Sequence, residues 1–439
     1  HAAVTERLRK PLPPPAIGRI HEVSGGNPFY AIELARELDD RTLDAAAFAD
    51  AELPRTLGEV VRSRLDGFAP QVHEALLAAA RNGARVDVLV DGYGTADLPR
   101  EYIDTLLEAG IAIHVFDPRP RRLGLRTNIF RRMHRKLVVV DGERAFVGGI
   151  NYSADHLADF GPQAKQDYAV EIQGPLVADI HRFMRQAISP VRRSWWADLR
   201  RHTVPQHREG EAAAIFVTRD NGRHRNDIEQ HYLAAIRSAR SEILIANAYF
   251  FPGYRLLREL RNAARRGVRV GLVLQGEPDM PMVRAASKLL YDYLLSAGVE
   301  IHEYCQRPLH GKVAIVDEDW STVGSSNLDP LSLSLNLEAN VVIRDRAFNA
   351  CLGESLRKLV RDHCRQVQPS PDPQRKLRKA IAGVLVYHVV RHFPALAGWL
   401  PAHKPRLTTL TPSHQAEAAP LGEPGQAPDQ DPDHERHPA

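Results

Sequence analysis

The sequence contains one motif twice, and this duplication limits the folds that the chain can adopt. MHRKLVVVDGERAFVGGIN occupies residues 133–151, and LHGKVAIVDEDWSTVGSSN occupies residues 309–327. Each copy reads H-x-K, four apolar residues, Asp and then G-[GS]-x-N, with identical internal spacing. A repeat of this kind predicts two copies of one structural unit.

The segments that flank the motif repeat in the same order. AARNGARVDVLVDG at 79–92 matches AARRGVRVGLVLQG at 263–276, and DYAVEIQG at 167–174 matches EANVVIRD at 338–345. In each copy, helical patterns alternate with short β-branched runs, which is typical of α/β units. The sequence therefore predicts an α/β fold with two duplicated α/β/α halves about a pseudo-two-fold axis.

The two copies differ at their start. ILIANAYFF at 243–251 reads as a strand that opens the second copy. The corresponding residues 59–67 read EVVRSRLDG, which has a helical pattern without β-branched alternation. We therefore expect the first half to lack its opening strand and to expose a sheet edge.

Strand geometry brings together the polar residues of each motif. Residues i and i+2 of a strand point to the same face, so the histidine and lysine of each H-x-K project together. A hairpin would return the asparagine beside the histidine of the same motif. The aspartate lies five residues beyond the lysine, too far along the strand to touch the histidine, and we interpret it as fixing the turn. The two motifs supply His134, Lys136, Asp141 and Asn151, and His310, Lys312, Asp317 and Asn327.

Two acidic residues open the strands that follow the motifs. Asp167 and Glu338 each precede an alternating apolar segment. Either carboxylate can accept a hydrogen bond from the second ring nitrogen of its histidine and hold the tautomer. We therefore expect Asp167 and Glu338 to orient the two histidines.

Two such hairpins facing each other would present two imidazoles, two ammonium groups and two amides. This set suits attack on a phosphodiester, because one imidazole can attack phosphorus while the other protonates the leaving alkoxide. The ammonium and amide groups would bind the non-bridging oxygens. The phosphohistidine would then pass its group to an alcohol or to water. The lysines supply the positive charge, so we expect no metal and no other cofactor.

These motifs, HRKLVVVD with GGIN and HGKVAIVD with GSSN, resemble those of the phospholipase D superfamily, from about residue 75 to residue 408. LVDGYGT, HVFDPRP, NYSADH, QDYAVEIQGP and NAYFFPG are similar to segments of bacterial cardiolipin synthases of the shorter type. The resemblance implies a phosphatidyl transferase that joins phosphatidylglycerol to a second phospholipid or alcohol acceptor. It implies catalytic roles for His134, Lys136, Asp141, His310, Lys312 and Asp317 and phosphate binding by Asn151 and Asn327, and it favours His134 as the nucleophile.

The N-terminal region has a different resemblance. Residues 21–79, which include HEVSGGNPFYAIELARELDD, resemble the end of the ATPase region of LuxR/MalT-type transcriptional regulators. No G-x-x-x-x-G-K-[ST] phosphate loop occurs in the sequence, so we expect no nucleotide site. The alternative is a divergent helical extension. The expected organisation is a helical segment at 1–78, halves at 79–201 and 215–370 with a linker at 202–214, an amphipathic segment at 371–408 and a disordered tail at 409–439.

Two segments are candidates for membrane contact. No apolar run reaches the roughly 18 to 20 residues that span a bilayer. Residues 381–401 gather His388, Arg391 and His392 on one helical face, which predicts an interfacial helix; a helix packed on the protein core is the alternative. The loop 119–136 carries seven arginines and would either bind anionic headgroups or be solvated. We expect peripheral association with the cytoplasmic side of a bacterial cell membrane.

Two other functions use the same motifs. A nuclease would act through the same hairpins, but the net charge of +4 gives less basic surface than nucleic-acid binding favours. We therefore expect no nucleic-acid partner. The other alternative is a catalytically impaired fusion, in which the first half cannot complete its sheet.

Overall fold

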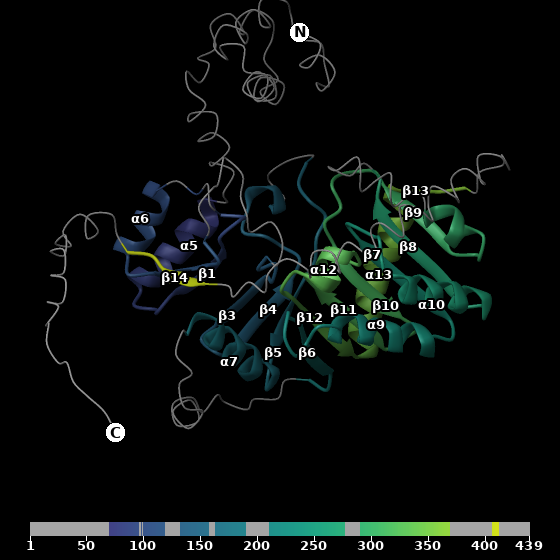
Figure 1. Cartoon of the computed structure of the whole chain (residues 1–439), viewed down its shortest axis with the longest axis horizontal. Coiled ribbons are helices and arrows are strands. Elements are labelled where there is room, and N and C mark those ends of the chain that lie inside the picture. Colours follow the sequence, from purple (N-terminus) through teal and green to yellow (C-terminus); the bar gives the residue numbers. More distant parts are fainter. Residues whose placement is uncertain are drawn as a thin grey trace, which may run out of the picture.

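Two α/β halves lie side by side in the computed structural model (Figure 1). The structure describes residues 70–95, 98, 100–118, 132–157, 163–189, 210–276, 290–368 and 406–411. Several sequence predictions lie wholly or mostly outside these residues: the regulator-like N-terminal segment with its helical pattern at 59–67, the arginine-rich loop, the interfacial helix at 381–401 and the disordered tail. Among the described residues, no helix combines the length and apolarity that crossing a membrane requires.

The elements of the two halves follow one another in the same order, as the duplication predicts. The first half contains α5 (Pro70–Arg81), β1 (Asp87–Asp91), α6 (Arg100–Glu108), β2 (Ala112–Phe116), β3 (Leu137–Val140), β4 (Arg144–Gly148), the 3-10 helix η1 (Ala154–His156), β5 (Ala169–Gln173) and α7 (Leu176–Ile188). The second half contains β6 (Ala213–Arg219), α9 (Asp227–Ser238), β7 (Glu242–Asn247), α10 (Tyr254–Arg265), β8 (Arg269–Gln275), β9 (Glu300–Tyr304), β10 (Lys312–Val316), β11 (Trp320–Gly324), α12 (Pro330–Ser334), β12 (Glu338–Arg344), α13 (Arg346–His363) and β13 (Cys364–Gln366). A short strand, β14 (Leu407–Thr409), follows near the C-terminus.

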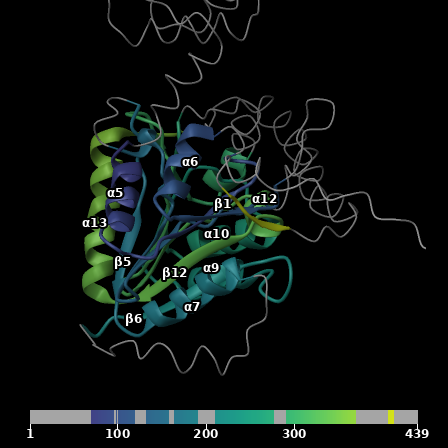
Figure 2. The same ribbon diagram turned by 90° about the vertical axis from the view of Figure 1, so that its left-hand side faces the viewer.

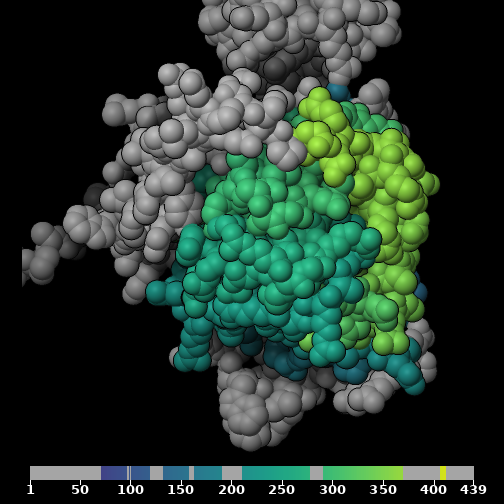
Figure 3. Space-filling view, turned by 90° about the vertical axis from the view of Figure 1, so that its right-hand side faces the viewer, coloured from purple at the N-terminus to yellow at the C-terminus, as the bar shows by residue number. Residues whose placement is uncertain are grey.

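The second half is built on one eight-stranded sheet in the order β13-β9-β8-β7-β10-β11-β12-β6. Strands β10 and β11 are buried along their whole length, which explains why VAIV and STVG read as continuous small and apolar runs. Helices α9 and α13 lie on opposite sides of this sheet (Figure 2). From the outer end of this half, the space-filling view shows the yellow-green α13 along one edge of the teal and green surface (Figure 3).

Within its described residues, the first half has two three-stranded sheets, in the orders β1-β2-β14 and β3-β4-β5. In the second half, β7 joins the two corresponding parts, because it pairs in parallel with β8 and antiparallel with β10. No described residue supplies the counterpart of β7 between β1 and β3. The expected absence of an opening strand stays a prediction, because residues 59–67 lie outside the described part.

Three boundaries differ from those predicted. Helix α5 packs on the small core beneath β1 and β2 and is the counterpart of α10, so the first half begins at or before residue 70 and not at 79. Strand β6 begins within the predicted linker and pairs with β12. Strand β14 pairs with β2 where the sequence predicts the junction of an amphipathic segment and a disordered tail. A three-residue strand has no detectable periodicity, and its partner lies in another part of the chain.

The two halves share one hydrophobic core. Val147 and Ile172 of the first half lie in the same buried cluster as Val323 and Val341 of the second. Two isolated parallel β-bridges also join the halves, Met133 with Leu337 and Gln166 with Leu309. The duplication relates these bridges to each other, and each one directly precedes a residue of the predicted site.

Candidate active site

The backbone at the two bridges brings the predicted catalytic residues together. His134 N donates to Leu337 O over 2.9 Å, and His310 N donates to Gln166 O over 2.8 Å. His134 is therefore fixed beside the first residue of β12, and His310 is fixed beside the residue two positions before β5. Those residues are the two acidic ones that the sequence singled out.

The histidine–carboxylate pairs are consequently crossed between the halves. His134 Nδ1 lies 3.0 Å from Glu338 Oε2, and His310 Nδ1 lies 2.6 Å from Asp167 Oδ2. The sequence prediction gave each carboxylate to the histidine of its own half, and the structure corrects this pairing. Within a half, a third strand lies between the strand of the H-x-K motif and the strand that follows the carboxylate, so these two outer strands are about 10 Å apart. Across the bridges they are neighbours.

Both carboxylates are almost fully shielded from solvent. Their side chains are 0% exposed for Glu338 and 2% exposed for Asp167. Burial raises the pKa of Glu338 to about 7 and also raises that of Asp167, while the neighbouring lysines oppose both shifts. A carboxylate that accepts from Nδ1–H leaves the lone pair of Nε2 available to react.

The two lysines lie between these pairs, and Lys312 is buried while Lys136 is half-buried. Lys136 Nζ donates to His134 O over 2.8 Å, and Lys312 Nζ makes the equivalent bond to His310 O. Burial lowers the pKa of Lys136 to about 8 and that of Lys312 to about 7, although the buried carboxylates counteract it. Burial, followed by the charges of both lysines, also holds the pKa of His134 and His310 well below its usual value. The resting site therefore has neutral imidazoles beside ammonium groups that can bind an anion.

The second position of G-[GS]-x-N lies against the orienting carboxylate in each half. A Cβ at Gly149 would lie 2.3 Å from Asp167 Oδ1, so only glycine fits there without displacing that carboxylate. In the second half, Ser325 occupies this position and donates from Oγ to Glu338 Oε2 over 2.6 Å. Sequence reasoning missed Ser325, although the change from glycine to serine between the copies was visible.

The two asparagines follow β4 and β11, as the hairpin interpretation requires. Asn327 is buried, and its Oδ1 has no hydrogen-bond partner among the described residues. Asn151 is half-buried. An amide oxygen only accepts hydrogen bonds, so contact with a phosphate oxygen would have to come from the Nδ2 group of the same side chain. Phosphate binding by both residues stays a prediction.

The motif aspartates lie at the far ends of β3 and β10, away from the lysines. The Asp317 carboxylate accepts hydrogen bonds from the backbone N–H groups of Arg240, Ser241 and Glu242 and from the Ser241 hydroxyl. Asp141 and Asp317 both have a positive φ, of 55° and 52°. These positions agree with the turn-fixing role inferred from the spacing and lie away from the reacting groups.

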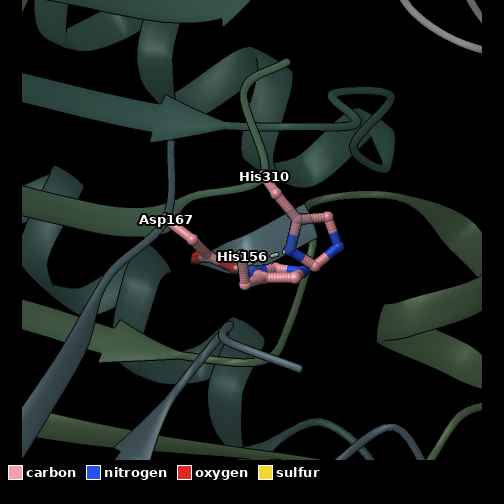
Figure 4. A group of neighbouring side chains, drawn as sticks. All are labelled: His156, Asp167 and His310. Carbon is pink, nitrogen blue, oxygen red and sulfur yellow. Dashed lines mark hydrogen bonds and ion pairs between the residues drawn. The ribbon is translucent and has the colours of Figure 1, made fainter. Parts of the chain in front are cut away.

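His156 is a site residue that sequence reasoning did not select. Figure 4 shows it beneath His310 and next to Asp167. Its Nδ1 lies 3.4 Å from Asp167 Oδ2, and its ring meets that of His310 edge-on with centroids 5.0 Å apart. The side chain is 1% exposed, and burial lowers its pKa to about 4, so the ring is neutral. The sequence feature that contains His156 is NYSADH at 151–156, which by itself indicates only the family resemblance.

His156, Asp167 and His310 also offer ligand atoms that lie within 4.8 Å of one another, which is a spacing that a metal ion can use. The ammonium of Lys312 interacts electrostatically with both Asp167 and His310 and opposes a cation there. We therefore interpret His156 as a residue that positions Asp167 and His310. The equivalent place in the second half holds Ser332, whose Oγ donates to Asp329 Oδ2 over 2.9 Å.

Two α/β halves with paired H-x-K hairpins and crossed histidine–carboxylate pairs define a phospholipase D-like protein. The family model described as "Cardiolipin synthase, PLD-like domain" matches residues 68–188 and 232–360. The chain belongs to this family, which confirms the resemblance seen in the motifs. The regulator resemblance of residues 21–79 stays a prediction.

Similar proteins agree with this assignment. The chain is 56% identical to cardiolipin synthase B of Salmonella typhi over 356 residues, which are 80% of this chain and 86% of the relative. It is 54% identical to cardiolipin synthase B of Escherichia coli K12 over 353 residues, 80% of this chain and 85% of the relative. The crystal structure of phosphatidylserine synthase from Haemophilus influenzae Rd KW20 matches with a TM-score of 0.54 and 16% identity, over 74% of this chain and 87% of that one. This last likeness shows the fold alone.

Proposed function

We propose that the protein is a phosphatidyl transferase of the cardiolipin synthase type. It transfers the phosphatidyl group of phosphatidylglycerol to a second phospholipid or alcohol through a phosphohistidine. The observation that carries the proposal is the pair of crossed histidine–carboxylate contacts around the buried Lys312 and the half-buried Lys136. The relatives named cardiolipin synthase B, at 54–56% identity, support phosphatidylglycerol as the donor.

In the first step, His134 is the nucleophile. Its Nε2 attacks the phosphorus of phosphatidylglycerol, a P–N bond forms, and the P–O bond to the terminal glycerol breaks. Binding of the anionic phosphodiester favours protonation of His310, which then gives its Nε2 proton to the leaving alkoxide. The charges of Lys136 and Lys312 stabilise the non-bridging oxygens, and the amides of the two motif asparagines complete this set of donors.

In the second step, the same groups act in reverse. His310, now neutral, takes the proton of the acceptor hydroxyl while the acceptor oxygen attacks phosphorus. The P–N bond breaks and returns His134 to its starting form. Glu338 and Asp167 hold the two rings by their Nδ1 atoms and stabilise each imidazolium as it forms, as the acidic residue of a catalytic triad does.

We also propose that the protein works at the membrane surface, on the cytoplasmic side, through residues 381–401 and the arginine-rich loop. An amphipathic helix with basic residues on one face would lie in the headgroup region. Replacing Val384, Leu385 and Val389 by aspartate should weaken binding to anionic vesicles. Undiminished binding would exclude this helix as the anchor. A C-terminal truncation is a poorer test, because it would also remove β14 from the first-half sheet.

The proposed activity is tested by incubating the full chain with phosphatidylglycerol vesicles and analysing the lipid and soluble products. Cardiolipin and glycerol should appear in equal amounts, and the H134N and H310N variants should form no cardiolipin. Phosphatidate as the main product would make the protein a phospholipase. Cleavage of DNA with no lipid product would favour the nuclease alternative.

A further inference from the structure

A pocket opens beside His310. It is lined by Lys165, Ala248, Tyr249, Gln275, Pro308, Leu309 and His310. Ala248 and Tyr249 follow β7, the strand whose first-half counterpart is absent from the described residues. Among the lining residues, Lys165 alone carries a permanent positive charge.

The frame of this pocket is duplicated. Gln275 Oε1 accepts a hydrogen bond from Leu309 N, the residue before His310. On the other side, Asp91 Oδ1 accepts from Met133 N, the residue before His134, over 2.9 Å. Equivalent backbone segments therefore lie beside His134 and beside His310. We interpret side chains that differ between these two places as differences in what each place binds.

Lys165 is one of these differences. The alignment of the repeats places Asn336 at its position in the second half, and the Asn336 side chain accepts from Arg132 N over 3.4 Å. Arg132 itself lies 3.1 Å from Asp91 and stacks over Tyr93. The catalytic lysines, by contrast, occur in both halves. The duplication therefore does not repeat Lys165 at its aligned position, and the cation on the His134 side, Arg132, is paired with Asp91.

The asymmetric part of phosphatidyl transfer is the identity of the alcohols. Lys136 and Lys312 already serve the phosphate that reacts, and the glycerol that leaves is neutral. An acceptor phospholipid with a glycerol headgroup brings a second phosphodiester, three carbons away from the hydroxyl that attacks. That second anion needs a cation beside the histidine that acts as the base, outside the centre where phosphorus reacts.

We propose that the pocket is the acceptor subsite, in which Lys165 binds the phosphodiester anion of the second phospholipid while His310 deprotonates its hydroxyl. The proposal rests on the transferase function proposed above. Lys165 is partly exposed, at 23%, and its ammonium also contacts the Asp155 carboxylate. An ammonium has three donors, so one contact with Asp155 leaves donors for a phosphate oxygen.

A structural role is the competing explanation for Lys165. Lys165 N donates to Asp155 O over 2.6 Å, so the ion pair could serve only to close the loop between them. The two explanations differ in their consequences. A structural pair is lost equally when either partner is neutralised, whereas an anion site is weakened by removing Lys165 and not by removing Asp155.

The experiment uses labelled phosphatidylglycerol as donor and compares two soluble acceptors, glycerol and glycerophosphoglycerol. These acceptors share the attacking hydroxyl and differ in the phosphodiester. The quantity measured is the ratio of kcat/KM for glycerophosphoglycerol to kcat/KM for glycerol. K165M should lower this ratio about 10- to 100-fold, the weight of one charge-assisted hydrogen bond to phosphate. D155N should keep or raise the ratio.

K358M is the matched control, because it removes the same charge from an exposed position on α13. It should leave the ratio at the wild-type value. Thermal unfolding of each variant verifies that the fold is retained. An unchanged ratio in K165M would overturn the proposal, as would an equal loss with both acceptors in K165M and D155N.

Two results with the wild-type protein distinguish failure of the acceptor subsite from failure of the transferase function. Transfer to glycerol without any preference for glycerophosphoglycerol would refute the acceptor subsite and leave the transferase standing. Transfer to neither alcohol would refute the transferase function, and the subsite with it.

Discussion

Replacing Glu338 by glutamine tests the crossed pairing of the two halves. The substitution keeps the size of the side chain but removes the charge that faces His134 Nδ1 across 3.0 Å. The amide can turn its NH₂ group toward Nδ1, which would place the ring proton on Nε2 and block attack on phosphorus. Because the Glu338 side chain is fully buried, water cannot take the place of the lost acceptor.

The expected loss follows from the kind of hydrogen bond that is removed. A bond to a charged group contributes about 1.5–3 kcal/mol, which corresponds to about 10- to 150-fold in rate. The loss should fall on kcat, since the carboxylate does not touch the substrate. S325A removes one donor from the same Glu338 oxygen, so its loss should be smaller, about threefold to tenfold.

The assay is rapid-quench measurement of the covalent intermediate during a single turnover. E338Q should slow formation of the intermediate at His134. D167N should instead slow the steps that need His310 as acid and base. Slow labelling of His134 in D167N, with normal labelling in E338Q, would show that each carboxylate serves its own half and would refute the crossed arrangement.

Three further predictions follow from the same contacts. The active form needs Glu338 ionised and Lys312 protonated, and burial brings the pKa of each group to about 7. The value of kcat/KM should therefore fall on either side of a narrow maximum near pH 7. A flat profile from about pH 6 to about pH 9 would contradict this prediction. H156S, which copies the serine of the other half, should lower kcat about tenfold at nearly constant KM, and an effect on KM alone would argue against a positioning role. D317A should lower the free energy of unfolding by about 2–4 kcal/mol, because it removes the hydrogen bonds that the Asp317 carboxylate accepts. D141A, at a similar positive φ, should lower it by clearly less in the same denaturation experiment. Equal losses would show that backbone strain dominates.

The sequence was sufficient to predict the two halves, because each repeated segment carries its own local pattern. The apolar runs, the H-x-K spacing and the G-[GS]-x-N ending all depend on residues close together in the chain. The acidic residues Asp167 and Glu338 were also found this way. What the local pattern could not give was their partners, because the bridges that cross the pairs join residues about 140 or 200 positions apart.

The same limit explains the residues that were missed. His156 lies in a short 3-10 helix without periodicity, and its role depends on contact with Asp167 of its own half and His310 of the other half. Ser325 differs from its counterpart, Gly149, by a hydroxymethyl side chain, and the importance of its hydroxyl is visible only once Glu338 is placed beside it. Strand β14 has three residues and pairs with β2 far away in the chain.

The most direct test of the account is to trap the covalent intermediate. The wild type, H134A and H310A are mixed with phosphatidylglycerol labelled in its phosphate, quenched with base and digested, and the labelled peptide is identified by mass spectrometry. We expect base-stable, acid-labile label on His134 in the wild type, accumulated and slowly released label on His134 in H310A, and no label in H134A. Normal turnover in either alanine variant, or label on any residue other than the two motif histidines, would contradict the two-histidine transfer mechanism.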